Sequence, residues 1–183
     1  GIKVGISKIV SHPALDAVEQ GIQDGIAAEG YTDVQYDLQN ANGDMTSAIS
    51  IASKFQNDQV SAAVGIATPT SQALVQVLTD IPVIFTAVTD PVSAELVPSL
   101  GASGTNVTGY SDMTPVREQI EMMVNLGGID SIGHVYSSGE ANAVVLADMA
   151  EEICNELGVE FITATVTNSA EVRTATLSIV DKV

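Results

Sequence analysis

Short apolar strand patterns alternate with amphipathic helix patterns along this chain, and this alternation constrains its fold more than any other feature. The run at 60–66, rich in Ala and Val, is typical of a buried strand, and the pattern at 13–29 places Leu15 and Val18 on one helix face before Gly30 ends it. Further strands are expected over 3–7, 34–38 and 81–85, and further helices after Asp44 and from 68–71. Alternating strands and helices form a parallel sheet with right-handed crossovers and helices on both faces. The sequence therefore predicts a doubly wound α/β fold.

A second α/β unit is predicted beyond residue 110. The loop-rich stretch 99–106 leads into a short strand over 106–110, after which the alternation starts again. The elements expected there are a helix with Thr114 as its cap and Pro115 at its first position, strands over 132–136 and 161–166, and helices over 142–157 and 169–179. Two strands cannot close a core of their own. The sequence thus predicts a first lobe over 1–110 and a second lobe over 111–183 that is incomplete in this chain.

The chain is strongly acidic, with 23 acidic side chains against 6 basic ones and a net charge of -17. Such a surface repels nucleic acid phosphates and anionic membranes, so neither is an expected partner. Cys154 is the only cysteine, which excludes an internal disulfide and a cysteine metal cluster. No apolar run approaches the ~20 residues that span a bilayer. We therefore expect a soluble globular protein without a nucleic acid partner.

The sequence offers little that catalysis could use. Walker-type and Gly-x-Gly-x-x-Gly phosphate motifs are absent, and two lone histidines, His12 and His134, make a weak case for a metal. Ser7, Ser71 and Ser137 lie near the ends of expected strands, but none of them lies in a Gly-x-Ser-x-Gly motif. The chain is therefore expected to carry no cofactor and to be no enzyme.

Small polar residues follow the carboxyl ends of the expected strands, where open α/β sheets bind ligands. The candidate ligand-binding residues are Ser7, His12, Thr68, Thr70, Ser71, Thr86, Ala87, Asp90, Ser111, Asp112, Ser137, Glu140 and Asn142. Helix starts at Thr70 and Asn142 would offer backbone N–H groups to a ligand carboxylate. Asp90, Asp112 and Glu140 would offer charge to a ligand ammonium, so the set predicts a zwitterion. In the structural alternative Asp90 begins a turn, and Asp112 and Asn142 cap helices.

Several linked motifs resemble those of a known family. They are Thr68-Pro69, the strand Ile81-Pro82-Val83-Ile84-Phe85 with Val88-Thr89-Asp90-Pro91-Val92, and Asn106-Val107-Thr108-Gly109 with Ser111-Asp112. In this order they resemble the substrate-binding proteins of a bacterial ABC-transporter family with the type I periplasmic-binding fold, over residues 3–183. The resemblance implies two lobes joined by hinge strands, with a first crossing near 110–113. It also implies a ligand cleft lined on one side by Ser7, Thr68, Thr70, Thr86 and Asp90, and on the other by Asp112, Ser137 and Asn142.

The same resemblance implies a transport receptor. Such a protein would be exported, either periplasmic or lipid-anchored at the cell surface, and would pass its ligand as a monomer to an ABC permease in the membrane. Some family members bind aromatic amino acids, so the expected ligand is an amino acid with an apolar or aromatic side chain. Phe85, Tyr110 and Tyr136 are the candidates for an aromatic wall. Two alternatives stay open on this fold, namely an enzyme and the effector domain of a transcription regulator.

Overall fold

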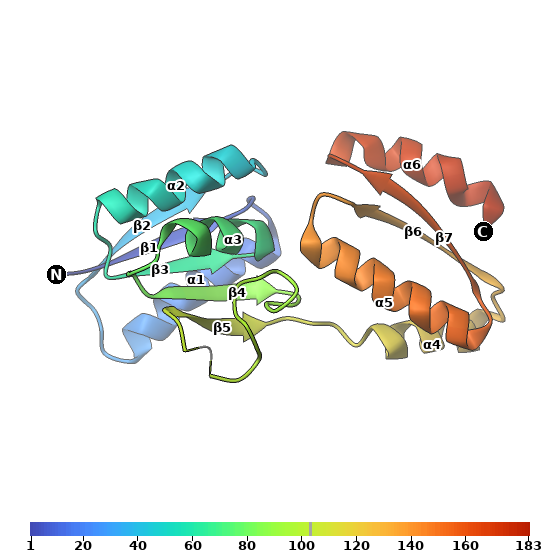
Figure 1. Ribbon diagram of the computed structural model, residues 1–183, viewed down its shortest axis with the longest axis horizontal. Coiled ribbons are helices and arrows are strands. Elements are labelled where there is room, and N and C mark those ends of the chain that lie inside the picture. The colour runs from blue at the N-terminus through green and yellow to red at the C-terminus, as the bar shows by residue number, and fades with distance from the viewer. Residues whose placement is uncertain (103) are drawn as a thin grey trace. The chain divides into compact units, whose positions relative to one another are not determined.

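The computed structural model describes residues 1–102 and 104–183, which form two units, Gly1–Met113 and Thr114–Val183 (Figure 1). Ser103, in the loop expected over 99–106, lies outside the described residues. The predicted division between residues 110 and 111 falls inside the strand Val107–Ser111, which belongs to the sheet of the first unit. The chain therefore leaves the first unit after this strand.

The first unit is a five-stranded parallel sheet with helices on both faces (Figure 1). Its elements are β1 (Ile2–Lys8), α1 (Pro13–Ala28), β2 (Val34–Asn40), α2 (Met45–Asn57), β3 (Ala62–Ile66), α3 (Thr68–Val77), β4 (Val83–Val88) and β5 (Val107–Ser111). The strand order β2-β1-β3-β4-β5 means that the sheet grows in opposite directions from the neighbouring strands β1 and β3. In open α/β sheets this reversal point leaves a crevice at the carboxyl ends of the strands. The predicted α/β fold is confirmed. Its strand order places the expected crevice at the carboxyl ends of the strands.

Each face of this sheet carries its own apolar layer. On one face α2 and α3 bury Phe55 and Leu74, and on the other α1 packs through Leu15 and Val18 (Figure 1). Gly5 of β1 allows the first layer to form, because a Cβ atom there would lie 2.8 Å from the ring of Phe55. The two layers hold the strands rigidly, so the positions of their carboxyl ends are well defined.

Strand β4 continues beyond its predicted end. Thr86 and Ala87, expected in a loop, both belong to β4, whose pairing register with β5 shifts between Phe85 and Val88. Two residues of β4 thereby oppose one residue of β5, which defines a β-bulge, and Ala87 has a positive φ of 52°. The loop prediction is wrong here because the polar Thr86 interrupts an apolar run without ending the strand.

The second unit contains two parallel strands between helices. Its elements are α4 (Val116–Gly127), β6 (Ser131–Ser137), α5 (Ala141–Leu157), β7 (Glu160–Val166), η1 (Ser169–Glu171), α6 (Val172–Ile179) and η2 (Val180–Lys182). Ile120 and Cys154 are buried where α4 meets α5. The cap predicted at Thr114 is wrong, because Pro115 occupies the N-cap position and no side chain caps α4; the Thr114 carbonyl accepts the N–H of Val116 instead, at 2.9 Å.

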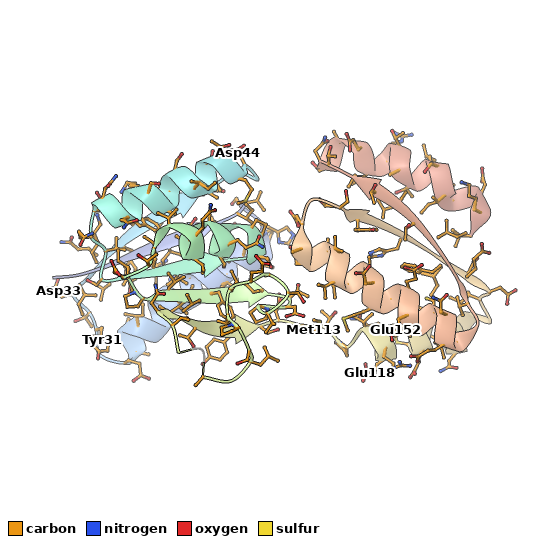
Figure 2. The ribbon with its side chains drawn as sticks, in the orientation of Figure 1. Tyr31, Asp33, Asp44, Met113, Glu118 and Glu152 are labelled. Carbon is orange, nitrogen blue, oxygen red and sulfur yellow. The ribbon has the colours of Figure 1, made fainter. Side chains whose placement is uncertain are left out.

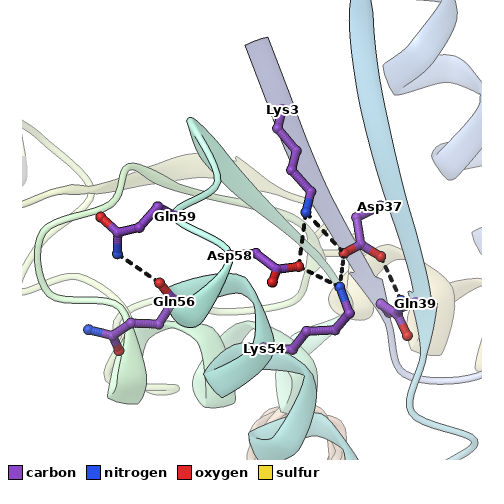
Figure 3. A network of polar contacts seen from close by, with 7 residues as sticks. All are labelled: Lys3, Asp37, Gln39, Lys54, Gln56, Asp58 and Gln59. Carbon is purple, nitrogen blue, oxygen red and sulfur yellow. Dashed lines mark hydrogen bonds and ion pairs between the residues drawn. The ribbon is translucent and has the colours of Figure 1, made fainter. Parts of the chain in front are cut away.

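An ion-pair network lies between β1, β2 and α2 on the first unit (Figure 3). Lys3 Nζ lies 2.9 Å from Asp58 Oδ2 and 4.0 Å from Asp37 Oδ2, and Lys54 pairs with the same two carboxylates. The hydrogen bond from Lys54, followed by the one from Lys3, lowers the pKa of Asp58 to about 2.

Across residues 1–102 and 104–183, no helix has the length and apolar character that crossing a membrane requires.

Candidate functional site

The carboxyl ends of four strands bring the first-unit candidates to one edge of the sheet. Ser7 lies near the end of β1, and Thr68 begins α3 directly after β3. Thr86 of β4 pairs with Ile66 of β3, and Asp112 follows β5. These residues come from separate parts of the sequence, yet the parallel register places them on the edge where the sheet topology leaves a crevice.

Buried hydroxyl groups connect this edge to the first turn of α3. The side-chain oxygens of Ser7 and Thr70 lie 2.5 Å apart, and the Ser71 hydroxyl donates to the carbonyl of Ala67 at 2.8 Å. Ser7, Thr68, Thr70 and Ser71 are all buried. The contact between the Ser7 and Thr70 hydroxyls therefore links β1 to α3, whereas the Ser71 hydroxyl bonds within the start of α3. Thr68, the first residue of α3, is 2% exposed.

The N-terminus of α3 offers backbone donors at the same edge. The helix begins at Thr68 rather than at the predicted Thr70, and no side chain caps it. Pro69 lacks an N–H, so Thr68 and Thr70 supply the first two donors of the helix. Together with the positive end of the helix dipole, these donors suit an anionic group such as a carboxylate.

Two backbone features that the sequence did not reveal position this helix start. A Cβ atom on Gly65 would lie 2.9 Å from the Cα of Ser71, so glycine allows α3 to approach β3 closely. Ala67 has a positive φ of 84°, which is rare for a residue with a side chain, and its N–H donates to the carbonyl of Thr86 at 3.0 Å. A turn glycine usually signals such a conformation in a sequence, and here alanine stands in its place.

The two candidate carboxylates of the first unit differ in what they contact. Asp90 accepts hydrogen bonds from the N–H groups of Val92 and Ser93, at 3.0 and 3.1 Å, and from the Ser93 hydroxyl at 2.8 Å. These bonds, with the Ser93 N–H foremost, lower the pKa of Asp90, so this residue forms the turn of the structural alternative. Asp112 is exposed, and no described residue bonds to its carboxylate. Of these two candidates, Asp90 is held in a turn by its hydrogen bonds and Asp112 is not.

Ser111 and His12 have local structural partners. The Ser111 hydroxyl donates to the carbonyl of Thr89 at 2.7 Å and accepts the N–H of Met113 at 3.1 Å, which fixes the chain just beyond β5, where Met113 is labelled in Figure 2. His12 Nδ1 accepts the N–H of Ala14 at 3.2 Å and caps α1. Both side chains thus hydrogen-bond to the backbone near the carboxyl ends of the strands.

The second unit carries its candidates at the carboxyl end of β6. Ser137 ends the strand, and Glu140 rather than the predicted Asn142 is the N-cap residue of α5. Asn142 Nδ2 donates to Glu140 Oε2 at 3.3 Å, while Asn142 Oδ1 is buried without a partner among the described residues. The proposed contacts of these three residues with a ligand stay a prediction.

The aromatic candidates have different environments. Phe85 is buried in the core, whereas Tyr110 is 79% exposed. Both line a cavity of about 240 Å³ beside β5 that also includes Ser111. Tyr136 of the second unit stacks on His134 with ring centroids 5.5 Å apart. Tyr110 is therefore the aromatic candidate of the first unit whose ring is free to meet a ligand.

Groups for acid–base or nucleophilic chemistry do not come together in the described residues. His12 and His134 belong to different units, and burial lowers the pKa of His134. Burial also raises the pKa of Cys154, which keeps this thiol protonated and unreactive. Within 1–102 and 104–183, no group of three or more histidine, cysteine or acidic residues could hold a metal ion. What the first unit brings to this edge is the N-terminal N–H groups of α3 and the exposed carboxylate of Asp112.

Sequence comparisons agree on one family. The model of the family described as ABC transporter substrate binding protein matches residues 3–183. A curated relative, the tyrosine-binding protein of Clostridioides difficile (strain R20291), is 37% identical in an alignment 184 positions long, which covers 98% of this chain and 53% of the relative. The chain thus spans about half the length of that relative.

Solved structures show the same likeness. A conserved domain protein from Vibrio cholerae is 44% identical with a TM-score of 0.96, over 99% of this chain and 62% of that one. The ABC domain of Streptococcus pneumoniae in complex with L-Trp is 36% identical with a TM-score of 0.96, over 100% of this chain and 63% of that one. A leucine-binding protein from Thermotoga maritima, at 17% identity and a TM-score of 0.76, shares the fold. The fold is that of the type I periplasmic binding proteins.

Proposed function

Because the chain belongs to the ABC transporter substrate-binding protein family, we propose that this protein is an extracytoplasmic receptor that captures an amino acid for an ABC permease. The ligand is an amino acid with an apolar or aromatic side chain. The tyrosine-binding relative and the L-Trp complex, at 37% and 36% identity, support this class of ligand. The receptor binds and releases its ligand without covalent chemistry, acts as a monomer, and is exported to the periplasm or held at the cell surface by a lipid anchor.

One observation carries the proposal: among the residues that the structure describes, the donor-rich edge of the first sheet has no free lysine or arginine side chain. Lys3, Lys8 and Lys54, the basic residues of this unit, are all held in ion pairs. A ligand carboxylate would therefore be bound by the N-terminal N–H groups of α3 and by the Thr68 hydroxyl. The exposed carboxylate of Asp112 would bind the ammonium. Anion and cation sites on one edge fit a zwitterion.

The first experiment titrates the full-length protein with each of the twenty amino acids and follows the melting temperature. A ligand that binds only the folded state stabilises it by mass action, so one or a few apolar or aromatic amino acids should raise the melting temperature in a saturable way. Twenty flat titrations would overturn the proposal. Turnover of a bound amino acid would instead favour an enzyme.

The second experiment tests the ammonium site. Replacing Asp112 with asparagine removes the charge but keeps the shape of the side chain. The dissociation constant for the amino acid should rise roughly tenfold or more, since a charge-assisted hydrogen bond contributes about 1.5–3 kcal/mol. Asp80→Asn is the matched control, because Asp80 precedes β4 at the opposite edge of the sheet and is exposed. Equal losses in the two variants, measured by calorimetry, would remove Asp112 from the site.

A further inference from the structure

Lys8 is the cation nearest to the donor-rich edge of the first sheet. It is the last residue of β1 and directly follows Ser7. The other basic residues of this unit lie toward the opposite edge, with Lys3 near the start of β1 and Lys54 in the last turn of α2. Lys8 is therefore the basic residue of this unit that lies at the carboxyl end of a sheet strand.

Two carboxylates of α1 occupy the Lys8 ammonium. Its Nζ lies 2.7 Å from Asp16 Oδ1 and 3.0 Å from Glu19 Oε1. Asp16 and Glu19 are three positions apart on α1, so both reach the same side of the helix. The Lys8 and Glu19 side chains are only 12% and 14% exposed, and Asp16, which the Ser11 hydroxyl also contacts at 3.0 Å, is 44% exposed. One positive charge thus faces two negative ones.

A contribution to the stability of the fold does not explain Glu19, the second carboxylate beside Lys8. Glu19 Oε1 contacts Lys8, but Glu19 Oε2 is buried and has no hydrogen-bond partner among the described residues. A buried, unpaired carboxylate oxygen is destabilising. Asp16 already pairs with Lys8, so a neutral residue at position 19 would leave one complete ion pair without this cost. What Glu19 adds is negative charge beside the Lys8 ammonium.

We propose that Asp16 and Glu19 are specificity-determining residues that keep Lys8 from binding the side-chain carboxylate of an acidic amino acid. This inference rests on the proposed amino-acid receptor. A ligand with a second carboxylate would bring a negative charge to an edge where the Lys8 ammonium is already paired and where Asp112 is also negative. Like charges at a binding site exclude the wrong ligand, whereas a zwitterion with a neutral side chain meets no such repulsion.

The test compares the ligand preference of Glu19→Gln with that of Asp58→Asn. Both variants remove one carboxylate from a lysine ion pair, but Asp58 lies in the network of Lys3 and Lys54 at the other edge. In Glu19→Gln, the affinity for L-glutamate relative to L-tyrosine should rise roughly tenfold, a change of about 1.4 kcal/mol. Asp58→Asn should leave this ratio unchanged. Adding Lys8→Met to Glu19→Gln should abolish the gain. A ratio that stays constant in Glu19→Gln, or that moves equally in both variants, overturns the inference.

A second measurement separates this inference from the proposed function. Sodium sulfate is compared with sodium chloride at equal ionic strength, and the melting temperature is recorded without any amino acid. In Glu19→Gln the Lys8 ammonium keeps one of its two carboxylate partners, Asp16, so it should bind sulfate more readily and give a sulfate stabilisation larger than the general one that wild type and Asp58→Asn show. Without this gain the inference fails, even where wild type binds L-tyrosine. If wild type binds no amino acid, the receptor proposal fails, while the sulfate result still decides whether Glu19 restrains Lys8.

Discussion

A single pair of hydroxyls joins the centre of the first sheet to the helix that starts at its edge. The side-chain oxygens of Ser7 and Thr70 lie 2.5 Å apart, and both residues are fully buried. Replacing Ser7 with alanine leaves the Thr70 hydroxyl buried without its partner. We expect the free energy of unfolding to fall by about 1–3 kcal/mol, which urea denaturation measures.

Two variants control this prediction. Ser50→Ala removes an exposed hydroxyl that donates to the carbonyl of Thr46, and it should change stability by less than about 0.5 kcal/mol. The double variant Ser7→Ala with Thr70→Val replaces both partners with apolar groups, so it should recover part of the lost stability. If the double variant loses the sum of the two single effects, the hydroxyls do not act as a pair.

Asp58 carries a pH dependence whose sign follows from its ion pairs. Hydrogen bonds from Lys54 and Lys3 lower the pKa of Asp58 from 3.8 to about 2. A depressed folded-state pKa stabilises the protein above the unfolded pKa, and this contribution is lost as the pH falls toward about 2. Wild type should therefore be more stable than Asp58→Asn near neutral pH, and the difference should shrink steadily below about pH 4. Urea midpoints of both proteins across this range check it, and a constant difference would contradict it.

Side-chain roles at the edge were only partly predictable from the sequence. The sequence identified Ser7, Thr70 and Asp90 as polar residues near strand ends. It did not reveal that the first two pair with each other, or that Asp90 is satisfied by Ser93. Hydrogen-bond partners depend on tertiary distances, which periodicity does not encode. That Asp90 has hydrogen-bond partners and Asp112 is exposed could likewise not be predicted from the sequence.

At the scale of elements, Gly65 controls how closely α3 approaches β3. An added Cβ atom would lie 2.5 Å from Ser71 Oγ and 2.9 Å from Ser71 Cα, so the backbone of the helix would have to move. Gly65→Ala should therefore lower the free energy of unfolding by about 1–3 kcal/mol. It should also weaken amino acid binding, because it displaces the N-terminal donors of α3. Urea denaturation and calorimetry measure the two effects.

Gly21 provides the matched control for Gly65. It lies inside α1, and no atom lies within 4 Å of where its Cβ would be. Gly21→Ala should stabilise the protein by about 0.5–1 kcal/mol, since alanine favours the helix and nothing has to move. The argument about Gly65 would be contradicted if its alanine variant were as stable as Gly21→Ala.

Regular elements followed from the sequence because local patterns specify them. Asp44 caps α2 by accepting the N–H of Ser47 at 2.6 Å, as its position before an amphipathic run predicts, and Figure 2 labels it at the start of that helix. Gly158 ends α5 in a left-handed conformation, again as predicted. The bulge at Thr86 and Ala87 and the positive φ of Ala67 had no such signal. Both depend on how neighbouring strands pair, and both lie at the candidate site.

At the scale of the molecule, the order of strands and helices indicates the fold, whereas the net charge bears on which partners the chain can bind. The alternation of strands and helices identified the fold, and the linked motifs identified the family whose model matches residues 3–183. The net charge of -17 identified neither, but it predicts that the chain repels nucleic acid phosphates. Ligand identity was not available from the sequence, because main-chain donors at the edge would bind the carboxylate of any amino acid in the same way.

Net charge also predicts how salt acts on the folded protein. With 23 acidic side chains and 6 basic ones, repulsion among carboxylates outweighs the few ion pairs. Raising sodium chloride from about 0.01 M to about 0.1 M shortens the screening length from about 30 Å to about 10 Å, so the melting temperature at neutral pH should rise. Near pH 4.1, the isoelectric point of the chain, the net repulsion vanishes and the same salt step should have no stabilising effect. A melting temperature that falls with salt at neutral pH would show that the ion pairs of Lys3, Lys8 and Lys54 dominate instead.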